Sequence, residues 1–370
     1  MGHPRIGSES DPGFFLHRST TAMRAISIMP PLWGKAAMHQ IVLAVALLCL
    51  IAVSTGMGYI EIPLPTVLRA LWGKMFGLES MLSRIEDLHL VTIFEVRLPR
   101  ILTAAAVGSG LGLSGAVFQG ILLNPLADPY TLGVSAGAAF GASTALLFVP
   151  ALLGPYTVFI FAFAGAVLTL FAVISLSSSA GGMSSNNLIL SGVIVTAILS
   201  AGISFCKYLA QERVSVIVFW LLGSLASSTW LEVGLVFSVV GLGFAVCLYF
   251  ARALNIICLG GRTASTLGIS PQRTRLVLLV TASLVAAVCV AVSGIIGFVG
   301  LLVPHMMRGL TGPDHMRLLP VSLLCGGLLL LGADTLTRAV LPQEVPIGVL
   351  TSLLGGPFFC YVFRKRQMAL

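Results

Sequence analysis

Residues 97–122 read RLPRILTAAAVGSGLGLSGAVFQGIL, in which an uncharged and mostly apolar run follows two arginines. About 20 apolar residues in a helix are enough to cross a lipid bilayer. Pro99 suits the first turn of such a helix, where its missing N–H group is not needed. Gly108 and Gly112, four residues apart, let a second helix approach closely. The stretch therefore predicts a membrane-spanning helix packed against other helices.

The composition of the whole chain agrees with this prediction. The 370 residues are 57% hydrophobic and 9% charged, whereas a soluble domain averages about 25% charged residues. So few charges cannot cover a surface that faces water. The net charge of +8 does not indicate nucleic acid as a partner, because the basic residues lie between apolar runs rather than on a soluble domain. The sequence predicts an all-α membrane protein.

Hydropathy and length divide the chain into full-length candidate spans and one shorter piece. The shorter piece, 301–311, lies between two glycines and contains Pro304, and it is counted as the tenth helix. Another short apolar piece, 215–226, is expected to lie at the membrane interface. The full-length spans are 38–58, 99–122, 131–149, 156–176, 187–208, 232–251, 274–296, 318–340 and 346–363.

An even number of helices places both termini on one side of the membrane. More than half of the 21 Lys and Arg residues fall on that side, which the positive-inside rule assigns to the cytoplasm. We therefore expect 1–37 to be a cytoplasmic N-terminal extension, poorly ordered, and 38–366 to be a single transmembrane domain. On the outside, Leu64 to Phe76 shows near-helical apolar spacing and is expected to lie along the surface. On the cytoplasmic side, 252–273 predicts one or two short helices that invite a docking partner.

The sequence carries no nucleotide-binding motif. Gly34-Lys35 and Gly73-Lys74 lack the upstream glycine and the following Ser or Thr of a P-loop. ATP-driven transport would therefore need an ATPase on another chain. A secondary transporter or channel without an ATPase is the alternative. A proton-coupled transporter would want carboxylates in the middle of the membrane, and these are nearly missing.

Two serine motifs suggest a hydrolase, but chance explains both. Ser114 lies in GLSG and Ser135 in GVSAG, which resemble the motifs of an intramembrane protease and of a nucleophile elbow. His305 is the only histidine well inside an apolar segment. Because Gly and Ser abound in these helices, we predict no catalytic residue. The seven cysteines form no C-x-x-C pair, so no metal site and no cofactor are predicted either.

A few charged residues lie at the expected outer ends of the spans. Asp334 and Arg338 are four residues apart on a helix and can pair, which lowers the cost of burying either charge. Arg97 and Arg100, three apart, are expected on one helix face at the outer surface. They act either as a simple interfacial anchor or as guanidinium groups ready to pair with the carboxylates of a partner.

Four long motifs, in order along the chain, carry a family resemblance. The run from Arg97 to Gly141 strongly resembles the permeases of binding-protein-dependent ABC importers for ferric siderophores, haem and cobalamin, and three further runs do so too. The resemblance covers roughly 40–366. The further runs are GFVGLLVPHMMR (297–308), DHMRLLP (314–320) and PIGVLTSLLGGPFF (346–359).

The resemblance implies a type II ABC importer permease fold with ten transmembrane helices per subunit. It implies a homodimer in the bacterial inner membrane, with the pathway along the dimer axis. Two ABC ATPase subunits would dock on the cytoplasmic side and a periplasmic or lipid-anchored substrate-binding protein on the other. The cargo would be an iron chelate (ferric siderophore or haem) or cobalamin, moved by alternating access, with the iron chelate favoured on base rates.

The resemblance also implies roles for particular residues. The binding protein would dock on Arg97, Arg100 and Arg338. Gly261 and Arg262 depart from the coupling pattern, since acidic residues are common in those places. Coupling helices near 254–269 would meet the ATPase through Leu259, Gly260, Ala264, Leu267 and Gly268, and the cytoplasmic gate would comprise Ser184, Ser185, Asn186 and Asn187.

Overall fold

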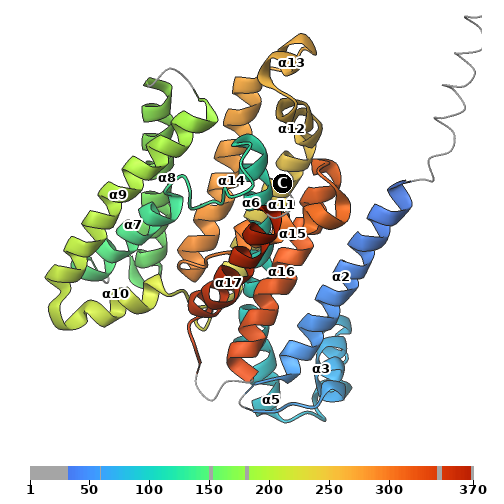
Figure 1. Ribbon diagram of the computed structural model, residues 1–370. Coiled ribbons are helices and arrows are strands. Elements are labelled where there is room, and N and C mark those ends of the chain that lie inside the picture. The colour runs from blue at the N-terminus through green and yellow to red at the C-terminus, as the bar shows by residue number, and fades with distance from the viewer. Residues whose placement is uncertain (1–31, 59, 150–152, 180–182, 340–343, 368–370) are drawn as a thin grey trace, which may run out of the picture.

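The computed structural model describes residues 32–367, except 59, 150–152, 180–182 and 340–343. Within these ranges the chain is built from helices and their connections, without strands. The helices run largely side by side, and the first helix stands at one edge of the bundle (Figure 1). The predicted N-terminal extension lies outside the described residues up to position 31.

Seven helical segments in the described part of the chain are long and apolar enough to cross a membrane, and two shorter apolar helices accompany them. With the short helix α15, these elements are the ten predicted from hydropathy. The membrane elements are α2 (Leu32–Gly56), α6 (Leu98–Ile121), α7 (Val134–Phe148), α8 (Thr157–Ser179), α9 (Ser185–Ala210), α11 (Trp230–Tyr249), α14 (Pro271–Ser293), α15 (Val299–Thr311), α16 (His315–Ala339) and α17 (Ile347–Gln367).

The connections carry further short helices at the two ends of the bundle. The piece expected at the interface, 215–226, corresponds to α10, which begins one residue and ends five residues earlier, and the segment expected along the outer surface is α3, with the predicted bounds. The segment expected on the cytoplasmic side forms two helices, α12 and α13, at the end where α2 begins, opposite α3 and α5 (Figure 1). The short elements are α3 (Leu64–Phe76), α4 (Glu79–Leu82), α5 (Asp87–Val91), η1 (Thr92–Arg97), η2 (Gly154–Tyr156), η3 (Gln211–Arg213), α10 (Val214–Leu221), α12 (Ala251–Cys258) and α13 (Gly261–Thr266).

Helix α6 is the centre of the bundle. Every residue in it except Arg100 and Leu102 is buried, and α16, α14, α15, α11 and α2 all pack against it. A Cβ atom on Gly108 would lie 2.3 Å from the carbonyl oxygen of Gly326 in α16, far inside contact distance. On Gly112 it would lie 2.5 Å from the Ser322 carbonyl oxygen. The predicted close helix packing at these glycines is therefore confirmed.

Helix α2 begins six residues before the expected span, since a helix continues beyond its most apolar stretch. Hydropathy also missed the helix preceding α6. Residues Asp87–Ile121 form one continuous helical segment, in which the six residues of η1 are wound as a π-helix. Its polar residues, among them Glu95, lower its hydropathy, so the expected span begins only at 99.

A polar turn connects α6 to α7. Asp128 accepts hydrogen bonds from the Tyr130 and Thr131 backbone N–H groups, at 3.0 and 2.9 Å. Burial raises the pKa of this carboxyl, and the hydrogen bonds from Thr131 and Tyr130 oppose that shift. The Tyr130 hydroxyl donates to the Ile296 carbonyl oxygen in the break between α14 and α15. The two interruptions of the helical bundle are thus bonded to each other.

Candidate functional site

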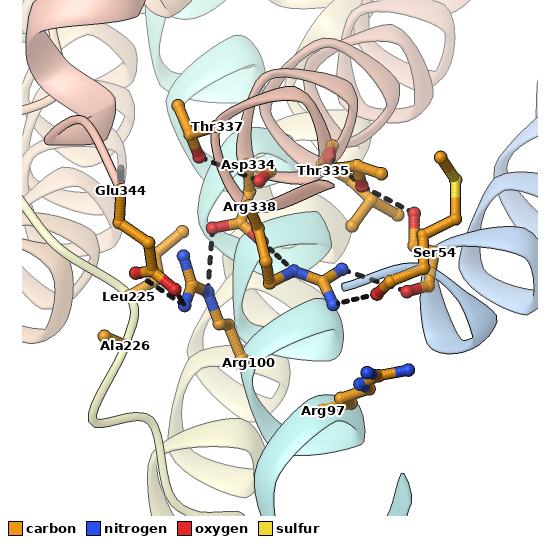
Figure 2. Close-up of polar contacts among 12 residues, drawn as sticks. Ser54, Arg97, Arg100, Leu225, Ala226, Asp334, Thr335, Thr337, Arg338 and Glu344 are labelled. Carbon is orange, nitrogen blue, oxygen red and sulfur yellow. Dashed lines mark hydrogen bonds and ion pairs between the residues drawn. The ribbon is translucent and has the colours of Figure 1, made fainter. Parts of the chain in front are cut away.

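Charged residues from two helices meet at the end of the bundle that carries α3 and α5. Arg100, near the start of α6, donates a hydrogen bond from Nε to Asp334 Oδ1 in α16 over 3.0 Å. The Arg338 Nε lies 3.7 Å from Asp334 Oδ2. Figure 2 shows the carboxylate joined to both guanidinium groups. The predicted Asp334–Arg338 pair is confirmed, and Arg100 is a third member that helical spacing did not indicate.

Arg338 also fixes the end of α2. Its Nη1 donates to the Met57 carbonyl oxygen at 2.7 Å and its Nη2 to that of Ser54 at 3.0 Å. One turn earlier in α16, the Thr335 hydroxyl lies 2.6 Å from the Ser54 hydroxyl. The last carbonyl groups of a helix have no partners within it, and a basic side chain near them is favourable. Arg338 therefore joins α2 to α16.

Arg97 performs the same task from the other side. Its Nη1 donates to the carbonyl oxygens of Thr55 and Gly56, at 2.8 and 3.1 Å, and its Nη2 donates to that of Ile60. Arg97 is only 5% exposed. The expectation that Arg97 and Arg100 share one exposed face was wrong. Residues three apart on an α-helix differ by about 60° in direction, and Arg97 turns to α2 while Arg100 turns to α16.

The cluster is nearly closed to solvent. The side chains of Asp334, Arg338 and Arg100 are 1%, 8% and 12% exposed. Glu344, just before α17, is 57% exposed and accepts a hydrogen bond from Arg100 Nη1, 3.2 Å from each carboxylate oxygen. A pocket of about 240 Å³ lies beside these groups, between the start of α17 and the loop after α10. Among the charges of this cluster, Glu344 is thus the one that faces outward.

The α12–α13 segment forms the opposite end. Leu259 and Leu267 are 74% and 62% exposed, whereas Ala264 between them is fully buried. Gly260 and Gly268 have φ angles of +123° and +78°, which favour glycine. The segment therefore presents two apolar side chains on a backbone shaped by glycine. Arg262, where the family pattern favours an acid, is exposed on α13.

The residues expected at the gate stand at the start of α9. The Ser184 hydroxyl caps this helix by accepting a hydrogen bond from the Asn187 backbone N–H at 3.2 Å. The Ser185 hydroxyl donates to the Ile121 carbonyl oxygen at the end of α6, over 3.5 Å. Asn186 is exposed. These polar side chains thus border the junction between α6 and α9 on the α12–α13 side of the bundle.

Sequence reasoning missed a polar network close to α12. The Asn255 carboxamide donates from Nδ2 to Asp314 Oδ1 over 2.7 Å, and its Oδ1 accepts from the His315 backbone N–H over 2.9 Å. Nearby, Arg308 Nη1 donates to Gln119 Oε1 over 3.0 Å. These groups line a pocket of about 540 Å³. The sequence offered one signal for it: Asn255 lies in the periodic segment 252–273, and Asp314 and His315 precede a span. This signal does not indicate which residues bond to each other.

One of the two serines in the hydrolase-like motifs, Ser114, packs inside the bundle. The Ser114 hydroxyl is fully buried and donates to the Ala282 carbonyl oxygen of α14 over 3.0 Å. It is thereby part of helix packing. No group of three His, Cys, Asp or Glu side chains among the described residues is arranged to hold a metal ion.

Comparison with known proteins gives one consistent result. The model of the FecCD transport family matches residues 45–365. The cobalamin import system permease protein BtuC of Halobacterium salinarum is 44% identical over 282 residues, 75% of this chain and 74% of that protein. The molybdate import system permease protein MolB of Haemophilus influenzae is 39% identical over 311 residues, 83% of this chain and 89% of that protein.

The fold has a solved counterpart. A structure described as an inward-facing conformation of a metal-chelate type ABC transporter matches with a TM-score of 0.77 at 35% sequence identity. It covers 88% of this chain and 98% of the matched chain. The family resemblance inferred from the four motifs is therefore confirmed by sequence and by structure.

Proposed function

This chain belongs to the FecCD transport family, and from that premise we propose that it imports a metal chelate or cobalamin as the membrane-spanning subunit of a binding-protein-dependent ABC importer. Members of the family are ABC transporter permeases, not enzymes. ATP hydrolysis is therefore the work of a partner. The proposed assembly is a homodimer in the inner membrane, with both termini in the cytoplasm, two ATPase subunits below and a binding protein above.

The observation that carries this proposal is the exposed α12–α13 segment. Leu259 and Leu267 are 74% and 62% exposed, although burial of an apolar side chain away from water is favourable. Apolar side chains on a rigid turn suit the core of a protein–protein interface. We assign this surface to the ATPase, with Gly260, Ala264 and Gly268 setting its shape.

The arginine cluster is proposed to dock the binding protein. Arg97 and Arg338 are held by the carbonyl groups of α2, so they serve this role by shaping the surface. Arg100 is different, because its exposed partner Glu344 can be displaced by an acidic side chain of a docked protein. Docking would then replace Glu344 at Arg100 by a carboxylate of the binding protein. It would thereby break the Arg100–Glu344 ion pair just before α17.

Alternating access is proposed to follow from ATP binding in the partner. Movement of the α12–α13 segments would rock the two permease subunits about the dimer axis. The network at Asn255 would transmit this movement to the start of α16, because its carboxamide bonds to both Asp314 and His315. Ser184, Ser185, Asn186 and Asn187 would form the gate that closes the cytoplasmic side.

The cargo is proposed to be an iron chelate, haem or cobalamin. One relative is named for cobalamin and another for molybdate, so membership of the family alone does not assign the cargo. Uptake of labelled ferric siderophores, haem, cobalamin and molybdate, in cells with and without this chain, is the direct test. Loss of one of the first three supports the proposal and names the cargo. Loss of molybdate uptake alone would overturn the cargo class while keeping the importer.

A second measurement tests the subunit assignment separately. The chain is purified under mild conditions with its ATPase, and a Leu267→Asp variant is compared with an Arg262→Gln variant. We expect the first to lose the ATPase and the second to keep it, because only the first places a charge in an apolar contact. Co-purification of the ATPase with Leu267→Asp at the wild-type ratio would contradict the assignment.

A further inference from the structure

Helix α3 has two apolar faces, and the chain covers only one of them. Val67, Ala70 and Gly73 are buried. They face a small core formed with the helices that follow, where a Cβ on Gly73 would lie only 3.0 Å from Leu82. On the opposite side of α3, other apolar side chains project away from the protein. The helix is therefore packed on one side and open on the other.

The open face is a stripe at helical spacing. Leu68, Trp72, Met75 and Phe76 are 51%, 55%, 67% and 56% exposed. The rings of Trp72 and Phe76 lie 4.6 Å apart between centroids, which makes a continuous aromatic surface. Solvent-exposed apolar patches of this kind mark a contact with a membrane or with another molecule.

The neighbouring helix shows which contact this is. Helix α2 packs beside α3, and only 6% of its most apolar window is buried inside the chain. Leu48 and Val53 along it are 67% and 43% exposed, as expected for side chains that face lipid. Because α3 begins eight residues after α2 ends, its open face would lie where the acyl chains around α2 give way to phospholipid headgroups.

A pocket on this face adds charge to the apolar stripe. It measures about 840 Å³, and six apolar side chains line it, among them Leu68, Trp72 and Phe94. Arg69 and Lys74 line it too, whereas none of its described lining residues is acidic. Five residues apart, these two cations lie about 140° apart around the helix axis, and both reach the pocket. The Lys74 ammonium lies 5.7 Å from the centroid of the Phe94 ring, which holds it over the pocket.

We propose that this pocket binds an anionic phospholipid of the outer leaflet, with its acyl chains along Leu68, Trp72 and Met75 and its phosphate between Arg69 and Lys74. A phosphodiester carries the charge that two flanking cations complement. The aromatic surface and the basic pair are the usual features of a helix in the headgroup layer. A zwitterionic phospholipid fills the same apolar stripe but gains less, since its ammonium group opposes the two cations.

The test is quenching of Trp72 by brominated phospholipids. The purified full-length protein is placed in mixed micelles that contain brominated phosphatidylglycerol or brominated phosphatidylcholine at equal mole fraction. The Trp72 signal is obtained by difference from a Trp72→Phe variant. Each basic side chain near an anionic surface contributes roughly a factor of five in affinity. We therefore expect phosphatidylglycerol to quench Trp72 with at least a fivefold lower half-saturation.

Matched variants separate the site from general charge. Arg69→Gln with Lys74→Gln is expected to abolish the preference, and Arg69→Lys with Lys74→Arg to retain it. Lys207→Gln with Arg213→Gln removes the same charge near the outer end of α9 and should leave the preference intact. Equal quenching of wild-type Trp72 by both lipids would overturn the proposal. So would loss of the preference in the Lys207 and Arg213 control.

Discussion

Replacement of Asp334 by alanine tests the closed arginine cluster most directly. The carboxylate is 1% exposed and faces Arg100 at 3.0 Å and Arg338 at 3.7 Å. Removing one partner of a buried ion pair costs about 3–5 kcal/mol, because a buried charge is left uncompensated. Here Arg338 keeps two backbone carbonyl partners and Arg100 keeps Glu344. We therefore expect the free energy of unfolding to fall by about 3 kcal/mol, at the lower end of that range.

The assay is reversible unfolding by sodium dodecyl sulfate in mixed micelles, followed by tryptophan fluorescence. Glu344→Gln is the matched control, because it removes a carboxylate from the same arginine at a site that is 57% exposed. Exposed ion pairs contribute about 0–1 kcal/mol. The cost of Asp334→Ala should also be the same at low and high salt, since buried charges are screened little. If Asp334→Ala lowers the free energy of unfolding no more than Glu344→Gln does, the inference that the cluster is desolvated is wrong.

Three further substitutions test the centre of the bundle and its two ends. Gly115→Val should prevent a monodisperse product on size-exclusion chromatography, because a Cβ there would lie 1.8 Å from the Gly300 carbonyl oxygen. Gly234 has open space around it, so Gly234→Val should leave the elution unchanged. Asn255→Ala should lower transport-coupled ATPase activity while the ATPase stays bound, since it cuts the link from α12 to α16. Arg100→Gln should slow binding-protein association more at low salt than at high salt, and the same rate at both would argue against docking there.

The fold could be predicted from the sequence because its signals are local. Hydropathy over about 20 residues locates a span without knowledge of its neighbours. The amphipathic spacing of α3 gave Leu64–Phe76 with its observed bounds, closed by Gly77 at a φ of 65°. Spacing of four residues likewise indicated the Asp334–Arg338 pair. Each of these predictions needed only residues close together in the chain.

The rest of the site depends on partners that are distant in sequence. Arg100 and Glu344 are 244 residues apart, and Asn255 and His315 are 60 apart. No local pattern states which carbonyl group a guanidinium will find. Arg97 shows the limit most clearly, because its carbonyl partner Thr55 lies 42 residues earlier in the chain. The roles of these residues in docking, coupling and gating stay predictions.

The pairing of α6 with α16 has a consequence for the time course of synthesis. Arg100 and Asp334 are 234 residues apart, and a ribosome that adds about 5–20 residues per second needs roughly 10–50 s to cover that distance. Throughout this interval α6 has already been made, while the carboxylate of Asp334 and the carbonyl oxygen that meets Gly108 do not yet exist. The centre of the protein therefore stays incomplete until α16, the last helix but one, has been made.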